Sequence, residues 1–527
     1  MFVVGVLKYG ERVWALMRAD SCGSSSLSAT SYKKDFRTDG AHHRRWYYEG
    51  HGIIKPLAVA YTLLDVPKQM FEGPTRYVKA INPRARPYKG VFMMDVVGLQ
   101  LSMMFDLLYT KAAVVHTWLG LFIRVISLAF TVTALWLFFT LSDQDGYSRV
   151  DVSVTKVLLI GAVILETMSL LRAVFSKWTA VLLFESACHD PLLRYHHELS
   201  ACGAFANLVG FAIVKVEFYG KAAMQLLLRS KTYWSGCCMQ QHSFFKLCKH
   251  TTGSKIAEMI GREDLWDSMF YSWTTHAPEF IIERVVRVLG TPTDSGSTHV
   301  TESHGLNALR RSGMKELMQL LTRTESEGEG ERLTMRLELD ESILVWHIAT
   351  HVYIQWLRED YTVHDDYSFR LRGAVEVLSN YMFFLLATRP YMLPYPVTRE
   401  RYVQLCYDTR TSLNLCSTFH LLRAIELQME ALMREDPFIP TPDMSPQPAP
   451  RSINPTLDIG CQLAANLIHR DNDLNVTLDM INGVWVEMLC YTAYRCNENF
   501  HAKHLSGGAD IMTVVALLMI YKSRDFF

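Results

Sequence analysis

Two long apolar runs dominate the hydrophobic pattern of this chain. The first covers Trp118–Leu141 and contains one charged residue, and the second covers Val152–Val174 and contains three. As a helix, each run is long enough to cross about 30 Å of hydrocarbon. The alternative is a pair of buried helices in a soluble protein, but two apolar runs of this length are unusual outside lipid. The pattern therefore predicts two membrane helices.

A short polar linker, Ser142–Asp151, separates the two runs, which predicts a helical hairpin. The charges before the hairpin indicate its orientation, because Lys33–Lys89 has 12 Lys and Arg against 5 Asp and Glu. Basic loops stay on the cytosolic side, so we expect the linker outside the cytosol and the chain after Lys177 inside it. The prediction is an integral membrane protein with a cytosolic C-terminal region.

Two charged side chains lie well inside the predicted spans, Arg124 in the first and Glu166 in the second. Both lie toward the cytosolic side, and their depths differ by roughly 4–5 Å at a rise of about 1.5 Å per residue. An unpaired charge at this depth costs at least about 2–3 kcal/mol. We therefore expect Arg124 and Glu166 to pair across the hairpin and to fix its register. A proton or ion relay is the alternative role of this pair.

A third apolar segment, Val91–Tyr109, carries the polar residues Asp95, Ser102 and Asp106. Their spacing puts all three on one stripe of a helix. We expect an amphipathic helix that lies at the membrane interface. A spanning helix whose polar stripe faces other helices is the second interpretation.

Two shorter apolar stretches lead to separate expectations. Met1–Leu7 is followed at once by charged residues and lacks the features of a signal peptide, so it resembles the end of a membrane helix whose beginning is missing. Ala201–Val216 is interrupted or bounded by polar residues, which favours a packed helix over a third span.

Helical periodicity dominates the chain after Lys177. Apolar residues recur at helical spacing in three segments, which are Ser412–Met433, Leu478–Cys496 and Asp510–Tyr521. One short strand is predicted at Leu333–Leu339, where apolar and polar residues alternate. Four polar stretches rich in Ser, Gly or Pro are expected to be linkers: Ser24–His43, Thr291–His304, Thr322–Glu331 and Glu435–Pro455.

The predicted fold is mainly α, with a transmembrane helical hairpin joined to a large helical cytosolic region. The hairpin is expected to be part of a larger N-terminal bundle. The predicted divisions of the chain are a membrane-helix end with a basic cytosolic loop (1–90), a membrane region (91–178), a helical cytosolic region (179–290), linkers with a short helix (291–339) and a helical C-terminal domain (340–527).

Composition narrows the classes of partner. The 527 residues carry 53 Lys and Arg against 53 Asp and Glu, so the formal net charge is zero. This balance gives no overall attraction for a polyanion, and nucleic acid is not an expected partner. The 11 cysteines are scattered without a repeated CxxC spacing. They indicate reduced thiols in a cytosolic setting rather than a disulfide framework.

The sequence gives little indication of an enzyme. No phosphate-binding glycine loop, GxSxG turn or HExxH pair occurs in it. His347 and His351 have a spacing that could hold zinc, but their neighbours are apolar and no third ligand is near. Core or capping histidines are the better interpretation, and no catalytic residue, metal site or cofactor is predicted.

Two local groups of Cys and His match no standard zinc module. They are Cys237, Cys238, His242, Cys248 and His250 in the first group, and Cys490, Cys496, His501 and His504 in the second. For the second group, helix packing followed by a helix end at Gly507–Gly508 is the better explanation.

Six stretches of the chain resemble one plant family of uncharacterised multi-pass membrane proteins, abundant in grasses. They are Met1–Leu16, Phe105–Ser127, Tyr147–Glu166, Ile343–Trp356, Leu378–Pro394 and Trp485–Met519. Members of this family carry domain of unknown function 4220 in the membrane half and domain of unknown function 594 at the C-terminus. The resemblance implies further membrane helices before the stretch that Met1–Leu16 matches, but no catalytic or ligand residue can be carried over from it.

The chain departs from the family pattern in three places. The family tends to have an acidic residue where His351 stands and a Glu where Asp510 stands. Asp190–Lys231 does not fit the pattern and resembles a divergent or inserted piece.

Three functional hypotheses remain. The first is a membrane-anchored scaffold or signalling component, with the lipid bilayer and protein partners of the cytosolic region as its contacts. The second is a transporter or channel-like protein that uses the intramembrane residues Asp95, Asp106, Arg124 and Glu166. The third and least supported is a membrane-bound enzyme.

Overall fold

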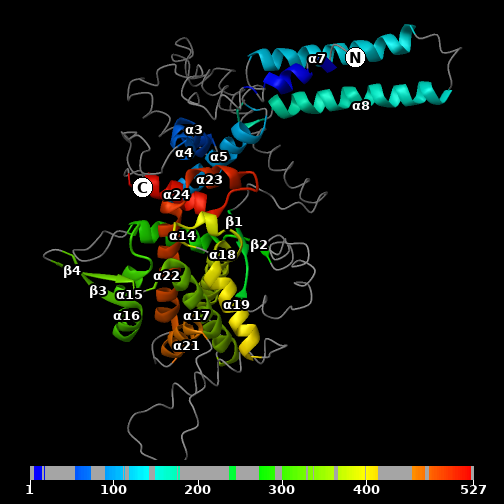
Figure 1. Ribbon diagram of the computed structural model, residues 1–527. Helices are drawn as coiled ribbons and strands as arrows, with labels where there is room; N and C mark the ends of the chain where they lie inside the picture. Colours follow the sequence, from blue (N-terminus) through cyan, green and yellow to red (C-terminus); the bar gives the residue numbers. More distant parts are fainter. Residues whose placement is uncertain are drawn as a thin grey trace, which may run out of the picture. The chain divides into compact units, whose positions relative to one another are not determined.

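The computed structural model divides the chain into two compact units (Figure 1). It describes residues 5–17 (except 7, 15 and 16), 54–72, 90–110, 112, 118–141, 149–178 (except 175), 237–244, 272–290, 300–360 (except 328, 329 and 336), 366–413 (except 398) and 454–523 (except 469–473). Unit 1 comprises Met1–Glu72, Asn82–Tyr88 and Phe92–Ser235, and unit 2 comprises Gly73–Ile81, Lys89–Val91 and Gly236–Phe527. In the described part of the chain, helices predominate and strands are short, which confirms the mainly α fold.

Unit 1 contains α3 (Ile54–Thr62), α4 (Asp65–Glu72), most of α5 (Gly90–Tyr109), α7 (Trp118–Leu141) and α8 (Arg149–Val174). The helices α7 and α8 pack along each other as a hairpin (Figure 1). The bounds of α7 are those predicted from the sequence, and α8 begins three residues earlier than predicted. The residues 8–14 are also helical.

Three helices of the described residues are long and apolar enough to cross a membrane, and they differ in burial. In α5, 44% of the apolar window Phe92–Tyr109 is buried, against 11% of the windows Phe122–Thr140 in α7 and Arg149–Leu171 in α8. Gln100 of α5 donates to the carbonyl oxygens of Ala60 (3.3 Å) and Leu63 (3.0 Å) at the end of α3. Helix α5 is therefore packed within its unit, whereas α7 and α8 leave most of their apolar surface exposed.

Unit 2 is built around a central helix, α22 (Leu474–Arg495). Around it lie α14 (Glu279–Gly290), α15 (Leu306–Ser312), α18 (Asp366–Thr388) and α24 (Ile511–Lys522). Apolar residues occupy every side of α22, as expected of a helix with neighbours all around it. Its Trp485 is fully buried and donates its indole N–H to the hydroxyl of Thr350 at 3.1 Å.

A second group of helices packs on α18. Helix α17 (Leu339–Asp360) lies against α18 and against α21 (Pro455–Ile468). The approach of α17 and α21 is close, because a Cβ atom at Gly460 would lie 3.0 Å from Cγ2 of Ile348. The remaining helices are α16 (Lys315–Leu321), the 3-10 turn η2 (Pro390–Met392), α19 (Glu400–Leu413) and α23 (Glu498–Leu505).

Two antiparallel strand pairs complete the described part of unit 2. Strand β1 (Cys238–Gln241) pairs with β2 (Trp273–His276). Strand β3 (Thr322–Glu327) pairs with β4 (Gly330–Met335) as a tight hairpin. The prediction of a linker at Thr322–Glu331 was therefore wrong.

The strand predicted at Leu333–Leu339 is only partly correct in its bounds. A strand does form there, but β4 begins before Leu333 and α17 begins at Leu339. The acidic composition of the preceding stretch hid its pairing, because cross-strand partners supply the backbone hydrogen bonds that local propensity does not predict.

The two C-terminal helix predictions are confirmed. Leu478–Cys496 corresponds to α22, and Asp510–Tyr521 corresponds to α24, with Asp510 as its N-cap residue. Several predicted segments lie wholly or largely outside the described residues, which are Ser24–His43, Asp190–Lys231, Ala201–Val216, Ser412–Met433 and Glu435–Pro455. Most of Thr291–His304 also does, but Thr301 and Ser303 are described and buried.

Candidate functional site

The two charges inside the hairpin do not pair with each other. Lys8 forms an ion pair with Glu166, and Arg124 Nη2 lies 3.5 Å from Oε1 of Glu11. Arg124 also donates from Nη1 to Ser169, both to its hydroxyl and to its carbonyl oxygen, the latter at 3.2 Å. The predicted Arg124–Glu166 pair is thus replaced by two pairs with the N-terminal helical segment, residues 8–14.

The sequence held a signal for these two partners that the prediction did not use. Lys8 and Glu11 are three positions apart, so on a helix they share one face. Both are close to an apolar stretch, and opposite charges on one face there can meet charges on two neighbouring helices. The Arg124–Glu166 prediction failed because it considered only the two longest apolar runs.

The predicted polar stripe of α5 is divided between two environments. Ser102 and Asp106 meet the chain just after α8, where Lys177 Nζ lies 3.2 Å from Oδ2 of Asp106 and also contacts the Ser102 hydroxyl. The indole N–H of Trp178 donates to the same carboxylate oxygen at 3.2 Å. Asp95, at the other end of the stripe, is exposed.

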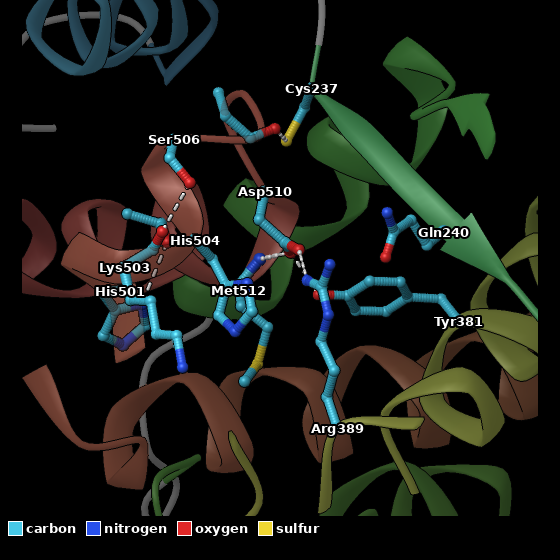
Figure 2. Close-up of polar contacts among 12 residues, drawn as sticks. Cys237, Gln240, Tyr381, Arg389, His501, Lys503, His504, Ser506, Asp510 and Met512 are labelled. Carbon is cyan, nitrogen blue, oxygen red and sulfur yellow. Dashed lines mark hydrogen bonds and ion pairs between the residues drawn. The ribbon is translucent and has the colours of Figure 1, made fainter. Parts of the chain in front are cut away.

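In unit 2, a buried polar cluster surrounds Asp510, at the start of α24 (Figure 2). One carboxylate oxygen, Oδ1, accepts from the hydroxyl of Tyr381 and from the backbone N–H of Met512 at 3.1 Å. The other oxygen, Oδ2, lies 3.4 Å from Nη1 of Arg389. Asp510 therefore ties the end of α18 to the first turn of α24.

Strand β1 reaches the same place. The backbone N–H of Cys238 donates to the carbonyl oxygen of Ala509 at 3.1 Å, and Cys238 forms an isolated parallel bridge with Asp510. The Cys237 thiol also points to the Ala509 carbonyl oxygen, with the sulfur 3.6 Å away (Figure 2). Only the tertiary structure brings these residues together, because 272 positions separate Cys237 from Ala509.

Burial controls the protonation of this cluster. It raises the pKa of the Asp510 carboxyl group, although Arg389 and the hydrogen bond from Tyr381 oppose the shift. Burial, followed by the nearby Asp510, raises the pKa of Tyr381 well above its usual value, and the same causes raise that of Cys237. The phenol and the thiol are therefore held neutral, so neither serves as a base or nucleophile near neutral pH.

The histidines of α23 lie beside this cluster. Burial lowers the pKa of His501 to about 4, and its Nδ1 lies 3.0 Å from the hydroxyl of Thr513. Burial, and then the charges of Arg389 and Lys503, lower the pKa of His504 to about 4. Helix α23 ends at Leu505, just before the predicted glycine pair, so the expected helix end at Gly507–Gly508 is confirmed.

His347 has the geometry of a core histidine. Its Nε2 accepts from the backbone N–H of Phe244 at 3.3 Å, and its Nδ1 lies 2.9 Å from the hydroxyl of Ser379. Its ring stacks on Phe383, with 4.3 Å between ring centroids, and His242 stacks on the same phenyl ring at 5.6 Å. Both nitrogens of His347 are therefore engaged, which is the interpretation favoured from the sequence.

Glu487 of α22 is a buried carboxylate that the sequence analysis did not single out. It accepts from the Ser303 hydroxyl at 2.9 Å and from the backbone N–H of Asn307 at 3.1 Å, and it pairs with Arg311. Burial raises the pKa of Glu487 even though these partners favour the charged form. Its place between the apolar residues Val486 and Met488 was the available signal, since a charged residue in an apolar stretch needs partners.

The polar clusters of both units share one property, which is that their charged groups are bound by other groups of the chain. Within the described residues, no group of three or more His, Cys, Asp or Glu side chains is arranged to hold a metal ion. Cys248 and His250, from the first predicted Cys/His group, lie outside the described residues. Several of these contacts join elements that are far apart in the chain.

Two family models match the chain. A model described as a domain of unknown function, DUF4220, matches residues 1–248, and a model described as a protein of unknown function, DUF594, matches residues 470–522. Both matches fall on the domains, and at the positions, that the resemblance in the sequence implied. No curated protein and no solved structure matches it.

The two matched regions of this DUF4220–DUF594 protein meet within unit 2. The DUF594 match covers α22, α23 and α24, which include the central helix of the unit. The last residues of the DUF4220 match form β1, whose Cys238 bonds to Ala509 of the DUF594 match. Of the helices around α22, three belong to neither match, which are α14, α15 and α18.

Proposed function

We propose that this DUF4220–DUF594 protein is an integral membrane protein whose α7–α8 hairpin crosses the bilayer. The observation that carries the proposal is the exposed apolar surface of both helices. Large apolar side chains that are exposed include Phe122, Phe130, Val132, Trp136 and Phe139 on α7, and Val154, Val157, Leu158, Ile164 and Leu165 on α8. Moving one such side chain from water into an apolar medium gains about 1.5–3 kcal/mol. Contact with lipid therefore stabilises the hairpin more than contact with water.

We assign to the C-terminal region the role of a scaffold or signalling component that binds protein partners on the cytosolic side. The basic stretch Lys33–Lys89 supports the cytosolic placement. The engaged buried carboxylates Asp510 and Glu487, together with the core histidine His347, support a binding rather than a catalytic role. In an active site, such groups would face a substrate instead of other groups of the chain.

A transporter is the alternative that the carboxylates of unit 1 raise. A transport path needs carboxylates that can exchange a proton or an ion. Glu166 is paired with Lys8, and Asp106 with Lys177 and Trp178. These pairs favour a structural role for both carboxylates.

The membrane proposal is tested by carbonate extraction of the full-length protein and by protease protection of a C-terminal tag. We expect the protein to remain with the membrane pellet, and the tag to be cleaved only when protease reaches the cytosolic face. Recovery of the protein in the soluble fraction, or cleavage of the tag from the opposite face, contradicts the proposal.

The scaffold role is tested by proximity labelling with the full-length protein and with a matched variant that lacks residues 236–527. We expect the full-length protein to label a set of cytosolic proteins that the shortened, membrane-retained variant does not. Identical labelled sets contradict the scaffold role. Ion or proton flux in proteoliposomes that Asp106→Asn abolishes would support a transporter instead.

A further inference from the structure

The two ion pairs between residues 8–14 and the hairpin determine the direction of the N-terminal segment. Glu166 lies five residues before Leu171, where the apolar window of α8 ends, and Arg124 lies two residues after Phe122, where that of α7 begins. At a rise of about 1.5 Å per residue, Glu166 is therefore roughly 7–8 Å inside the apolar zone and Arg124 roughly 3 Å.

Because Lys8 pairs with the deeper Glu166 and Glu11 with the shallower Arg124, the N-terminal segment runs outward along the chain. It is parallel to α8 and antiparallel to α7. Figure 1 shows the segment beside the ends of α7 and α8 that are remote from the loop joining them. Gly5 and Val6, the described residues before Lys8, therefore lie on the side of the segment nearer the centre of the apolar zone.

The sequence of the segment has the polarity that this direction requires. Residues 1–7 contain no charged side chain, whereas Lys8, Glu11 and Arg12 follow within five positions. A helix that leaves the hydrocarbon at its charged end requires this order of apolar and charged residues. An amphipathic helix lying flat on the membrane would instead alternate both kinds of residue along its length.

Three of the four paired side chains are largely shielded from solvent, and Lys8 is the exposed member. The side chains of Glu11 and Glu166 are only 5% and 6% exposed, and Arg124 is 15% exposed, while Lys8 is 46% exposed. Arg12, one position after Glu11, is exposed. The four paired residues carry two positive and two negative charges, so their sum is neutral, as low-dielectric surroundings demand.

We propose that residues 8–14 are the boundary end of a third membrane helix, held on the α7–α8 hairpin by the ion pairs Lys8–Glu166 and Glu11–Arg124. This inference rests on the proposed membrane location of the hairpin. The four side chains of these two pairs form a charge-neutral clasp. The clasp fixes the direction and the depth of the third helix, because sliding or reversing it would leave four charges unpaired in lipid.

Charge reversal of one pair tests the clasp. We compare Lys8→Glu, Glu166→Lys and the double variant that swaps both, using thermal unfolding of the full-length protein in detergent micelles. Each single reversal should lower the midpoint by roughly 5 °C or more, because it places two like charges together at the buried position of residue 166. The swap should recover at least half of the loss. Arg12→Glu makes the same charge change at an exposed position outside the clasp and should shift the midpoint by less than about 2 °C.

Two results would overturn the clasp. One is a swap that is as unstable as the worse single reversal, and the other is an Arg12→Glu variant as unstable as Lys8→Glu. If the reversals do not accumulate as folded protein, neutral variants replace them. Lys8→Met leaves Glu166 unpaired, so it should yield less folded protein than Lys8→Met combined with Glu166→Gln. Equal yields refute the pairing.

Carbonate extraction of the same preparations separates this inference from the proposed function. Release of the wild-type protein from the membrane would contradict the membrane location itself. A wild-type protein that stays in the membrane while the swap fails to restore stability would refute the clasp alone.

Discussion

Replacing Asp510 by Ala should destabilise unit 2 through two separate losses. The first is the N-cap of α24, where the carboxylate accepts from the backbone N–H of Met512, and losing such a cap costs about 1 kcal/mol. The second is the partner of the Tyr381 hydroxyl, which is fully buried. A buried hydroxyl left without a partner costs about 1–3 kcal/mol. We add nothing for Arg389, because its partly exposed guanidinium can turn to water.

The expected loss for Asp510→Ala is therefore about 2–4 kcal/mol in the free energy of unfolding. It is measured by urea unfolding of the detergent-solubilised full-length protein, followed by the fluorescence of its buried tryptophans. Asp366→Ala is the matched control, because this aspartate is also in the first turn of a helix but is exposed. That control should change the free energy by less than about 0.5 kcal/mol.

A double variant decides whether the stranded hydroxyl contributes. Tyr381→Phe removes the group that Asp510→Ala leaves without a partner, so the two losses should not add. We expect the double variant to be less destabilised than the sum of the single variants by about 1 kcal/mol or more. Additive losses, or an Asp510→Ala variant as stable as Asp366→Ala, would refute this account of the cluster.

Three further predictions concern the backbone, the pH dependence and the extent of unit 2. Gly305→Ala should destabilise the protein by about 1–3 kcal/mol, because φ at Gly305 is 98° and the new Cβ would lie 2.8 Å from Cγ1 of Val484. Gly373→Ala, in an open helical position, should instead stabilise the protein by about 0.5–1 kcal/mol. If both variants shift the urea midpoint of unfolding in the same direction from the wild-type value, this pair of predictions is contradicted. The pKa of His501 is lowered to about 4, so the unfolded state binds a proton more readily than the folded state. The free energy of unfolding should therefore decrease as pH falls from about 6.5 toward 4. His501→Asn should flatten this pH dependence, measured by urea titrations at each pH. A fragment of residues 236–527 should unfold cooperatively by circular dichroism, and one of residues 249–527 should not, because only the longer fragment contains β1; two equally cooperative transitions would show that β1 is dispensable.

The link between β1 and the DUF594 match changes how the family domains are understood. Sequence similarity separates the two matches by more than two hundred residues, from 249 to 469. In the structure, both contribute to unit 2, and the unmatched helices α17 and α18 lie between them in the chain and pack in the same core. Truncations designed on the boundaries of the DUF594 match alone would therefore cut through one hydrophobic core.

The sequence by itself determined the apolar helices. The bounds of α7 and the positions of α22 and α24 follow from runs and periods of apolar residues, which depend on neighbours within a few turns. The N-cap at Asp510 is equally local, since an Asp immediately before an apolar helix is a start signal. Propensity and periodicity suffice wherever the deciding contacts are near in the chain.

The tertiary structure alone decided the partners of the charged and polar groups. Arg124 meets Glu11 across 113 positions, Glu487 meets Ser303 across 184, and the strand of Cys237 meets Ala509 across 272. A buried charge signals that it needs a partner, but many residues of opposite charge can satisfy that need. Only the packing of helices selects one of them, because the cost of burying a charge depends on where the whole fold places it.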